Sequence, residues 1–277
     1  MSENSTALLA VIIPAFNEEA TIAQVLRMVD VLPCVREIIV VDDCSTDSTA
    51  SVVEACATPR TRLLRLPVNR GKAAAIRAAL KEVSSPITII QDADLEYDPK
   101  EIPFVIEPIV SGKADVVYGS RFLVRKAARV AYFHHYLANK MLTFCSNLLT
   151  NLNMSDIETG YKAFATPLLT WMPLTGRGFG IEVEVTAMIS KTRARIYEVP
   201  ISYYGRTYEE GKKIGFRDAV QAFWYIAFYN TIAAMGGRRR AYLTRINEWL
   251  IQFRGGVGAV GETAEHAARI STSARAS

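Results

Sequence analysis

The sequence predicts an α/β fold built on a mainly parallel sheet with helices on both faces. Apolar runs alternate with helical runs along residues 8–120, the order that is typical of a parallel sheet. The apolar runs are continuous rather than alternating, as in strands that are buried on both faces. Polar residues follow four of these runs directly, at the edge where such sheets bind ligands. We therefore expect a functional site along that edge.

The first half of the chain contains five expected strands, over residues 8–13, 37–43, 62–66, 87–90 and 115–118. Pro14 ends the first strand, and Asn17 is a suitable cap for a helix in which apolar residues recur at helical spacing from Ile22 to Val29. Further helices are expected from residue 45, over 72–83, where alanine is frequent, and over 101–110.

The second half is organised differently. A helix is expected over 132–149, with His135 and Asn139 four residues apart on one face. A helix reaching about Lys191 carries Glu182 and Glu184 near its start. Acidic side chains stabilise a helix when they lie near its N-terminus. A strand is expected next, then a basic loop and an aromatic helix, over residues 195–203, 206–213 and 216–234. Another basic loop is expected at 125–129.

From Gly236 the composition shifts to a basic cluster, a short amphipathic stretch to Phe253, and a tail rich in Gly, Ala, Ser and Thr. We expect this tail to be flexible. The aromatic helix beside residues 238–240, which are all arginine, suits an anionic membrane surface, although the helix could equally pack on the rest of the protein.

Composition narrows the class of protein. Of the 277 residues, 50% are hydrophobic, so the chain can bury a full core. The net charge of +4 does not suggest a nucleic-acid-binding protein. The four cysteines show no C-x-x-C spacing and are expected to be free thiols in a reducing compartment. With no signal peptide and no apolar run of about 18 residues, we expect a cytoplasmic protein that can touch a membrane surface.

An acidic cluster follows the fourth expected strand. Asp92, Asp94 and Glu96 are spaced by two, so in an extended segment their carboxylates point the same way. Such carboxylates repel each other unless a cation lies between them, and their oxygens suit Mg²⁺ or Mn²⁺. The alternative is an acidic turn in which an aspartate caps the next helix.

Seven motifs occur in a fixed order along the chain. They are PAFNE at 14–18, VDDCSTD at 41–47, NRGK at 69–72, DADLE at 92–96, GSR at 119–121, DIETGYK at 156–162 and RTYEEGKK at 206–213. Together they resemble the family 2 glycosyltransferases, nearest to the dolichyl- and polyprenyl-phosphate mannosyltransferase branch. The resemblance implies a glycosyltransferase-A fold, a GDP- or UDP-sugar donor, a divalent metal, a lipid phosphate acceptor and inversion at the sugar carbon.

The resemblance also implies roles for individual residues. Those that match the nucleotide pocket are Pro14, Phe16, Glu18, Val41, Asp43, Asp92 and Ala93. Asp92, Asp94 and Glu96 match the metal and diphosphate site, and Arg121, Arg206 and Lys212 match basic residues that contact phosphates. Arg121, His135 and Asn139 are the acceptor candidates. On this basis, residues 1–120 form a nucleotide-sugar half, residues 121–235 an acceptor half, and residues 236–277 a basic, flexible tail.

One departure from the family pattern concerns Cys44, which stands where the family usually has glycine. A residue with a side chain does not freely adopt positive φ, so the geometry of this loop is open. In the loop over residues 206–213, Arg206 and Lys212 would close over the diphosphate and shield the donor from water.

Three alternatives remain open at this point. The same chemistry on a soluble hydroxyl acceptor would need a carboxylate base, and Asp156 or Glu158 could serve. A signalling receiver domain is suggested by Asp42 and Asp43 after an apolar run, but a receiver is shorter and carries that pair on its first strand. A sugar-binding protein without activity is the third alternative, and the intact acidic and basic motifs argue against it.

Overall fold

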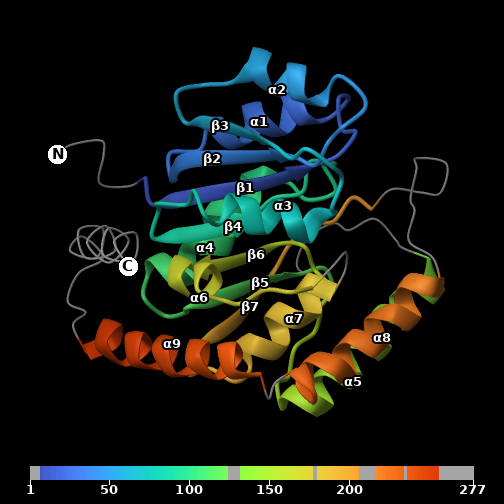
Figure 1. The fold of residues 1–277 in the computed structure, drawn as a ribbon, viewed down its shortest axis with the longest axis vertical. Helices are drawn as coiled ribbons and strands as arrows, with labels where there is room; N and C mark the ends of the chain where they lie inside the picture. The colour runs from blue at the N-terminus through green and yellow to red at the C-terminus, as the bar shows by residue number, and fades with distance from the viewer. Residues whose placement is uncertain (1–6, 124–131, 177–179, 206–215, 234–235, 256–277) are drawn as a thin grey trace.

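The computed structural model describes residues 7–123, 132–176, 180–205, 216–233 and 236–255. The described chain is built around a seven-stranded sheet with the order β3-β2-β1-β4-β6-β5-β7 (Figure 1). Strand β6 is antiparallel to both of its neighbours, and the other paired strands are parallel. The predicted α/β class with a mainly parallel sheet is therefore confirmed.

The strands are β1 (Leu9–Ala15), β2 (Val35–Asp42), β3 (Thr61–Arg65), β4 (Ile87–Ile90), β5 (Val116–Ser120), β6 (Lys162–Ala165) and β7 (Ile196–Pro200). Ile12 in β1 pairs with Ile39 in β2 and with Ile90 in β4, so continuous apolar runs meet at the centre of the sheet. The six expected strands are all present. Strand β6 was missed because its four residues directly follow a polar loop.

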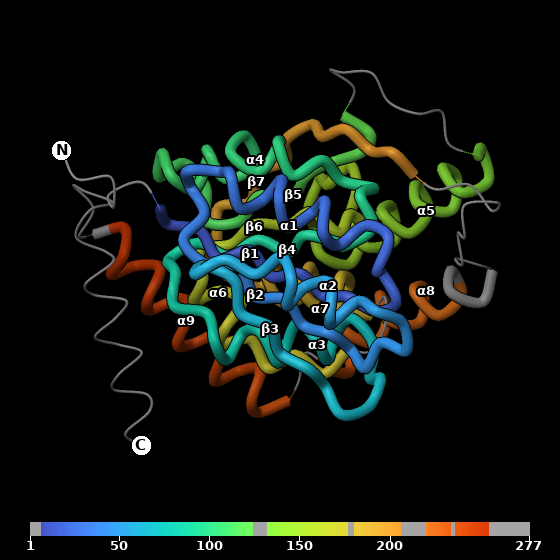
Figure 2. The backbone as a smooth tube through the Cα atoms, turned by 90° about the horizontal axis from the view of Figure 1, so that it is seen from above, coloured from blue at the N-terminus to red at the C-terminus, as the bar shows by residue number. Residues whose placement is uncertain are grey.

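The helices are α1 (Ile22–Asp30), α2 (Thr49–Cys56), α3 (Lys72–Ala79), α4 (Ile102–Val110) with a preceding 3₁₀ turn η2 (Pro99–Glu101), α5 (Phe133–Thr150), α6 (Thr166–Thr170), α7 (Gly180–Ile189), α8 (Phe216–Asn230) and α9 (Gly237–Gly255). Two hydrophobic clusters fill the two faces of the sheet. One contains side chains of α1, α2 and α4, and the other contains side chains of α3, α7, α8 and α9. Figure 2 shows the strands between α4 and α3.

Helix α9 is longer and better packed than the short amphipathic stretch that the sequence suggested. Its side chains Tyr242, Ile246 and Leu250 are buried in the core, and Arg254 donates a hydrogen bond to Asp115 at the start of β5. The beginning of the expected flexible tail is therefore a docked helix. The rest of that tail, residues 256–277, and the basic loops at 125–129 and 206–213 lie outside the described residues.

No helix among the described residues has both the length and the apolar character needed to cross a lipid bilayer. Within the described residues, the strands of the second half, β6 and β7, complete the sheet that the first half begins. The loop that leads into β6 consequently arrives at the edge where β4 and β5 end. That arrival brings residues from both halves of the chain together.

Candidate active site

The ends of β1 and β2 are tied together by their loops. Asn17 donates its main-chain N–H to the Ser45 hydroxyl at 3.0 Å, and Glu18 donates its N–H to the Thr49 hydroxyl at 2.8 Å. Asp43 is buried and accepts hydrogen bonds from the N–H groups of residues 70 and 71, at 2.9 and 2.6 Å. Gly71 has a φ of +80°, which a residue with a side chain rarely adopts. Asp43 thus fixes the turn into α3.

The expected nucleotide-pocket residues lie at or just inside this edge. Phe16 is exposed beside the end of β1, whereas Val41 and Ala93 are buried in the core. Val41 is paired on both sides within the sheet, with Pro14 of β1 and Leu64 of β3, so it supports the edge from inside. Cys44 has a φ of 61°, so the loop takes the left-handed conformation despite having a side chain there. This finding settles the question that the missing glycine raised.

The acidic turn after β4 is folded back on itself. The carboxylate of Asp94 accepts the N–H of Glu96 at 3.0 Å, and Leu95 between them has a φ of 61°. The carboxylate of Glu96 accepts the Tyr203 hydroxyl at 2.8 Å. No group of three or more acidic, histidine or cysteine side chains within the described ranges is arranged to hold a metal ion. The expected trio with Asp92 is therefore not assembled as one cluster.

Asp92 turns towards the interior of the site. Its Oδ1 lies 2.7 Å from Lys72 Nζ, and the same nitrogen lies 3.3 Å from Glu182 Oε1. Burial alone would lower the pKa of Lys72, but the two carboxylates raise it overall. A Cβ atom added to Gly160 would lie 2.6 Å from Asp92 Oδ2, so a side chain at this position would force Asp92 to move. The Lys72 charge thus links β4, α3 and α7.

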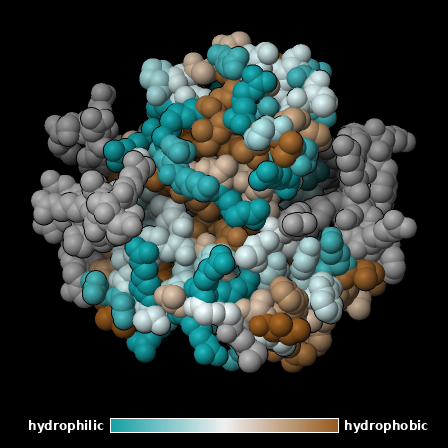
Figure 3. Space-filling view, viewed as in Figure 1, coloured by the Kyte–Doolittle hydropathy of each residue, from teal (hydrophilic) through white to brown (hydrophobic). Residues whose placement is uncertain are grey.

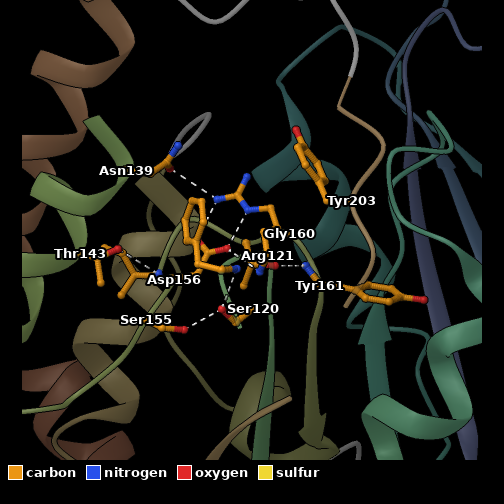
Figure 4. A network of polar contacts seen from close by, with 12 residues as sticks. Ser120, Arg121, Asn139, Thr143, Ser155, Asp156, Gly160, Tyr161 and Tyr203 are labelled. Atoms are coloured by element: carbon orange, nitrogen blue, oxygen red, sulfur yellow. Dashed lines mark hydrogen bonds and ion pairs between the residues drawn. The ribbon is translucent and has the colours of Figure 1, made fainter. Parts of the chain in front are cut away.

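Arg121, directly after β5, forms a two-point ion pair with Asp156 (Figure 4). Nε lies 2.7 Å from Oδ2 and Nη2 lies 2.7 Å from Oδ1, and Asp156 is fully buried. Arg121 Nη2 also donates to Asn139 Oδ1 at 3.4 Å, and its guanidinium carbon lies 5.2 Å from the centre of the Tyr203 ring. The neighbouring Asp156 raises the pKa of Arg121 against the effect of burial. Arg121 is therefore a fixed cation.

Tyrosines support both the acidic turn and the loop that carries Asp156. The rings of Tyr97 and Tyr161 are stacked with centroids 5.2 Å apart, and the Tyr97 hydroxyl accepts the N–H of Gly160 at 3.0 Å. Burial raises the pKa of Tyr97 to about 12 and raises that of Tyr203 as well. Both phenols therefore stay protonated at neutral pH and keep their hydrogen bonds.

A group of buried charges, formed by Glu158, Lys162 and Glu182, lies near the Arg121–Asp156 pair. Burial, then the nearby Glu182 carboxylate, raises the pKa of Glu158 to about 7. Burial lowers the pKa of Lys162 to about 8, although its Nζ donates to the carbonyls of Ile157 and Thr159. Among the described residues, Glu158 Oε1 and Glu182 Oε2 are buried without a hydrogen-bond partner. Glu158 thus exchanges its proton near neutrality.

The structure brings together most of the residues that the sequence singled out. Asn139 contacts Arg121, and the main-chain carbonyl of His135 accepts the side-chain N–H of Asn139 at 2.9 Å. Arg206 and Lys212 lie outside the described residues. Glu182 was interpreted as a charge at a helix start, yet every residue of α7 is buried. The only sequence signal was that the other positions of α7 are mostly apolar, which favours a buried helix.

Comparison with known sequences identifies relatives along most of the chain. Residues 10–168 match the family described as glycosyl transferase family 2. The undecaprenyl-phosphate mannosyltransferase of Micrococcus luteus is 28% identical over 217 residues, which cover 74% of this chain and 86% of that protein. The dolichol-phosphate mannosyltransferase of Pyrococcus furiosus is 28% identical over 211 residues, covering 74% of this chain and 59% of that protein.

Solved structures share the fold. Glucosyl-3-phosphoglycerate synthase from Mycobacterium tuberculosis, in complex with Mn²⁺, UDP-glucose and phosphoglyceric acid, matches with a TM-score of 0.63 and 21% identity, over 86% of this chain and 81% of that one. The same synthase with Mg²⁺ and UDP matches with a TM-score of 0.59 and 24% identity, over 75% of each chain. The sheet and its helices are thus of the glycosyltransferase-A type.

Proposed function

The chain belongs to glycosyltransferase family 2, and from this premise we propose that it moves a hexose, mannose or glucose, from a GDP- or UDP-sugar to a polyprenyl or dolichyl phosphate. The two mannosyltransferases named above support a lipid phosphate as the acceptor. In this proposal residues 1–120 bind the donor, residues 121–235 meet the acceptor, and the enzyme works at the cytoplasmic face of a membrane.

The observation that carries the proposal is the state of the two acids beside Arg121. Both oxygens of Asp156 accept hydrogen bonds from Arg121, so this carboxylate is already committed. Glu158 Oε1 is buried, and its carboxyl lies near Glu182 and Lys162. The Asp156 carboxylate is therefore held by Arg121, and the buried Oε1 of Glu158 is not open to a hydroxyl acceptor. A phosphate acceptor needs no base, because its oxygen is already ionised.

The proposed reaction is a single displacement at the sugar carbon. An oxygen of the acceptor phosphate forms a bond to the anomeric carbon as the bond from that carbon to the donor diphosphate breaks. The leaving nucleoside diphosphate takes the electron pair, and the configuration inverts. Arg121, as a fixed cation at the end of β5, would hold the incoming phosphate, with Asn139 and His135 of α5 beside it.

A divalent cation fits the acidic turn as part of a mixed site. Mg²⁺ is commonly held by one or two carboxylates together with substrate phosphates, and Asp94 and Glu96 are two such carboxylates at the end of β4. Asp92 is paired with Lys72, so in this proposal it would contact the donor nucleotide rather than the cation. The solved structures of the same fold with Mn²⁺ or Mg²⁺ and UDP support this choice of metal. When bound, the cation would offset charge on the leaving diphosphate.

Two further groups of residues complete the proposal. The donor nucleotide would contact the edge formed by β1, β2 and β4, through Pro14, Phe16, Glu18, Val41, Asp43, Asp92 and Ala93. Arg206 and Lys212, in the Gly-containing segment 206–213, would contact the diphosphate. The second assignment depends on sequence resemblance alone and is tested by removing each charge.

The test is transfer of a radiolabelled sugar by the purified full chain. GDP-mannose and UDP-glucose would be offered with a short-chain polyprenyl phosphate in detergent and with Mn²⁺ or Mg²⁺. We expect label to enter the organic phase only when the lipid phosphate is present. The matching polyprenyl alcohol serves as the control, since it lacks the phosphate. Transfer to the alcohol or to a soluble hydroxyl, with none to the phosphate, would overturn the proposal.

A further inference from the structure

Helix α5 exposes an apolar face. Its outward residues Phe133, Leu137, Met141, Phe144 and Leu148 follow one another by three or four positions, so they form one stripe along the helix. Phe133, Phe144 and Leu148 are 74, 68 and 73% exposed, which is unusual for side chains of this size. In a surface helix of a globular protein, such an apolar stripe normally faces the core.

The opposite face of α5 is polar and points inward. Asn139 accepts from Arg121, and Thr143 accepts the N–H of Ile157 at 3.4 Å. Asn147 exchanges two hydrogen bonds with the main chain of Met154, at 2.8 and 3.1 Å. The helix is thus inverted, with its hydrogen-bonding side chains committed to the active-site loop and its large apolar side chains turned outward. This orientation cannot be reversed without losing the contacts that hold the loop.

Helix α8 packs beside α5 and extends the exposed surface. The two helices are in contact along their lengths and project together at the lower right of Figure 1. Ala222, Ile226 and Tyr229 of α8 are buried in the core, whereas Trp224 on the other face is 62% exposed. Hydrophobic side chains are visible in brown at the lower right of Figure 3, where α8 lies. We call the outward faces of α5 and α8 the two-helix surface.

The charged side chains described at this surface are positive. Helix α5 contains Lys140 and no Asp or Glu, and residues 220–230 of α8 contain no charged residue. Two exposed arginines, Arg238 and Arg240, follow α8 at the start of α9, while Arg239 between them is buried against Glu184. An apolar, aromatic surface with basic residues at its border is complementary to an anionic lipid interface. A second copy of the chain would instead bring like charges together.

We propose that the two-helix surface lies in the interfacial region of an anionic lipid bilayer, without crossing it. The inference deepens the proposed function, because it names the surface through which the enzyme meets a lipid acceptor. The same helix α5 then has lipid on its outer face and Arg121 on its inner face. Lipid headgroups would lie close to Arg121, and a lipid phosphate could reach that residue without leaving the membrane.

The experiment is flotation of the full chain with vesicles that contain no polyprenyl phosphate. We expect binding to vesicles of phosphatidylglycerol and phosphatidylcholine, little binding to phosphatidylcholine alone, and release at high salt. The double variant Phe144→Ser with Leu148→Ser should bind at least ~10-fold more weakly, as expected for two apolar side chains that are withdrawn from lipid. Quenching of Trp224 fluorescence by brominated lipids, absent in Trp224→Phe, would report contact directly.

A matched control is Val31→Ser at the end of α1, because Val31 is also 74% exposed but lies far from the two-helix surface. This variant should bind vesicles normally. Equal binding by the double variant and the wild type would overturn the inference. So would a dimer in solution that the double variant converts to a monomer, since a second copy would then cover the surface.

The experiments distinguish a failure of the membrane inference from a failure of the proposed function. The double variant changes two exposed side chains on the outward face of α5, so its transfer to a detergent-dispersed short-chain polyprenyl phosphate should be unchanged. Absence of vesicle binding together with normal transfer would remove only the membrane inference. Normal vesicle binding without any transfer to a polyprenyl phosphate would remove only the proposed function.

Discussion

Arg121 and Asp156 are joined by two parallel hydrogen bonds of 2.7 Å, across 35 positions of the sequence. Asp156 is fully buried, and the side chain of Arg121 is only 13% exposed. The pair therefore couples the end of β5 to the loop before β6. It also positions one cation beside the ring of Tyr203, whose hydroxyl donates to Glu96 in the acidic turn after β4.

Replacing Arg121 by lysine should weaken use of the acceptor. Lysine keeps the charge but has no planar fork, so it cannot hold both oxygens of Asp156 and still offer an N–H to a phosphate. We expect KM for the polyprenyl phosphate to rise roughly 10-fold, about the 1.4 kcal/mol of one charged hydrogen bond, with a smaller change in KM for the donor. Steady-state kinetics with the acceptor varied at saturating donor measures this effect.

Arg195→Lys is the matched control for Arg121→Lys. Arg195 binds Asp115 through the same fork, with distances of 2.9 and 3.2 Å, but at the opposite edge of the sheet. Its replacement should reduce stability without altering acceptor kinetics. If both variants left acceptor dependence unchanged while Asp156→Asn or Glu158→Gln abolished transfer, a hydroxyl acceptor would replace the phosphate.

Removing the charge of Lys72 should destabilise the fold. In Lys72→Met the Asp92 and Glu182 carboxylates, which are 20 and 8% exposed, lose their shared cation. We expect a loss of about 3 kcal/mol in the free energy of unfolding, measured with urea, as for a buried ion pair that loses one partner. Adding Asp92→Asn should recover part of this loss. Lys81→Met, at an exposed lysine after the same helix, should have little effect.

Glu158 makes stability depend on pH. Its pKa is raised from 4.5 to about 7 in the folded protein, so the folded state keeps a proton that the unfolded state has lost. The contribution of this group to stability therefore falls as pH rises from about 4.5 to about 7. Glu158→Gln removes the titration, and the variant should be more stable than wild type at pH ~7.5 by ~1 kcal/mol or more.

The Glu158→Gln comparison is made by thermal unfolding at acidic and neutral pH. At the acidic end the variant and the wild type should differ little. Glu107→Gln, at an exposed glutamate of α4, should show no pH-dependent difference. A stability difference for Glu158→Gln that is the same at every pH would mean that this carboxyl titrates normally.

The sequence predicted the parallel strands and their polar ends because these features are local. Continuous apolar runs followed by Asn17, Asp43 or Asp94 can be seen within a few residues of each strand. The antiparallel β6 was missed because four residues carry too little pattern. Strand β6 matters for the site because the loop that leads into it carries Asp156 to Arg121.

The charge pairs could not be predicted for a different reason. Asp92 was expected to point towards a metal with Asp94, but its partner is Lys72, which lies 20 positions earlier in α3. Glu182 meets the same lysine from α7. Local sequence gives the position of a carboxylate in its own element, whereas the cation that it meets depends on how distant elements pack.

Cys44→Gly should stabilise the protein slightly. Cys44 has a φ of 61°, a conformation that costs a residue with a side chain roughly 1 kcal/mol relative to glycine. Glycine relieves that strain but adds freedom to the unfolded chain, so a net gain of ~0.5 kcal/mol is expected. Cys44→Ala is the control, because it removes the thiol and keeps the strain. Equal stability of the glycine and alanine variants would show that the loop is not strained.

Asp94→Asn should reduce turnover while leaving the fold intact. The carboxylate of Asp94 lies at the end of β4 and accepts the N–H of Glu96, a bond that an asparagine oxygen can also accept. The variant therefore keeps the shape of the turn and removes one negative charge. Loss of a major electrostatic stabiliser predicts at least ~10²-fold lower turnover, and a weaker rise in melting temperature when Mn²⁺ is added with UDP or GDP.

Asp98→Asn is the matched control for the metal assignment, since its carboxylate caps η2 by accepting the N–H of Lys100. It should retain both turnover and the response to Mn²⁺. Because Asp94→Asn relieves repulsion between Asp94 and Glu96, its melting temperature without metal should match or exceed that of wild type. Full turnover of the wild type in excess chelator would rule out a catalytic cation, and the acidic turn would then serve only to orient the loop that Tyr203 holds.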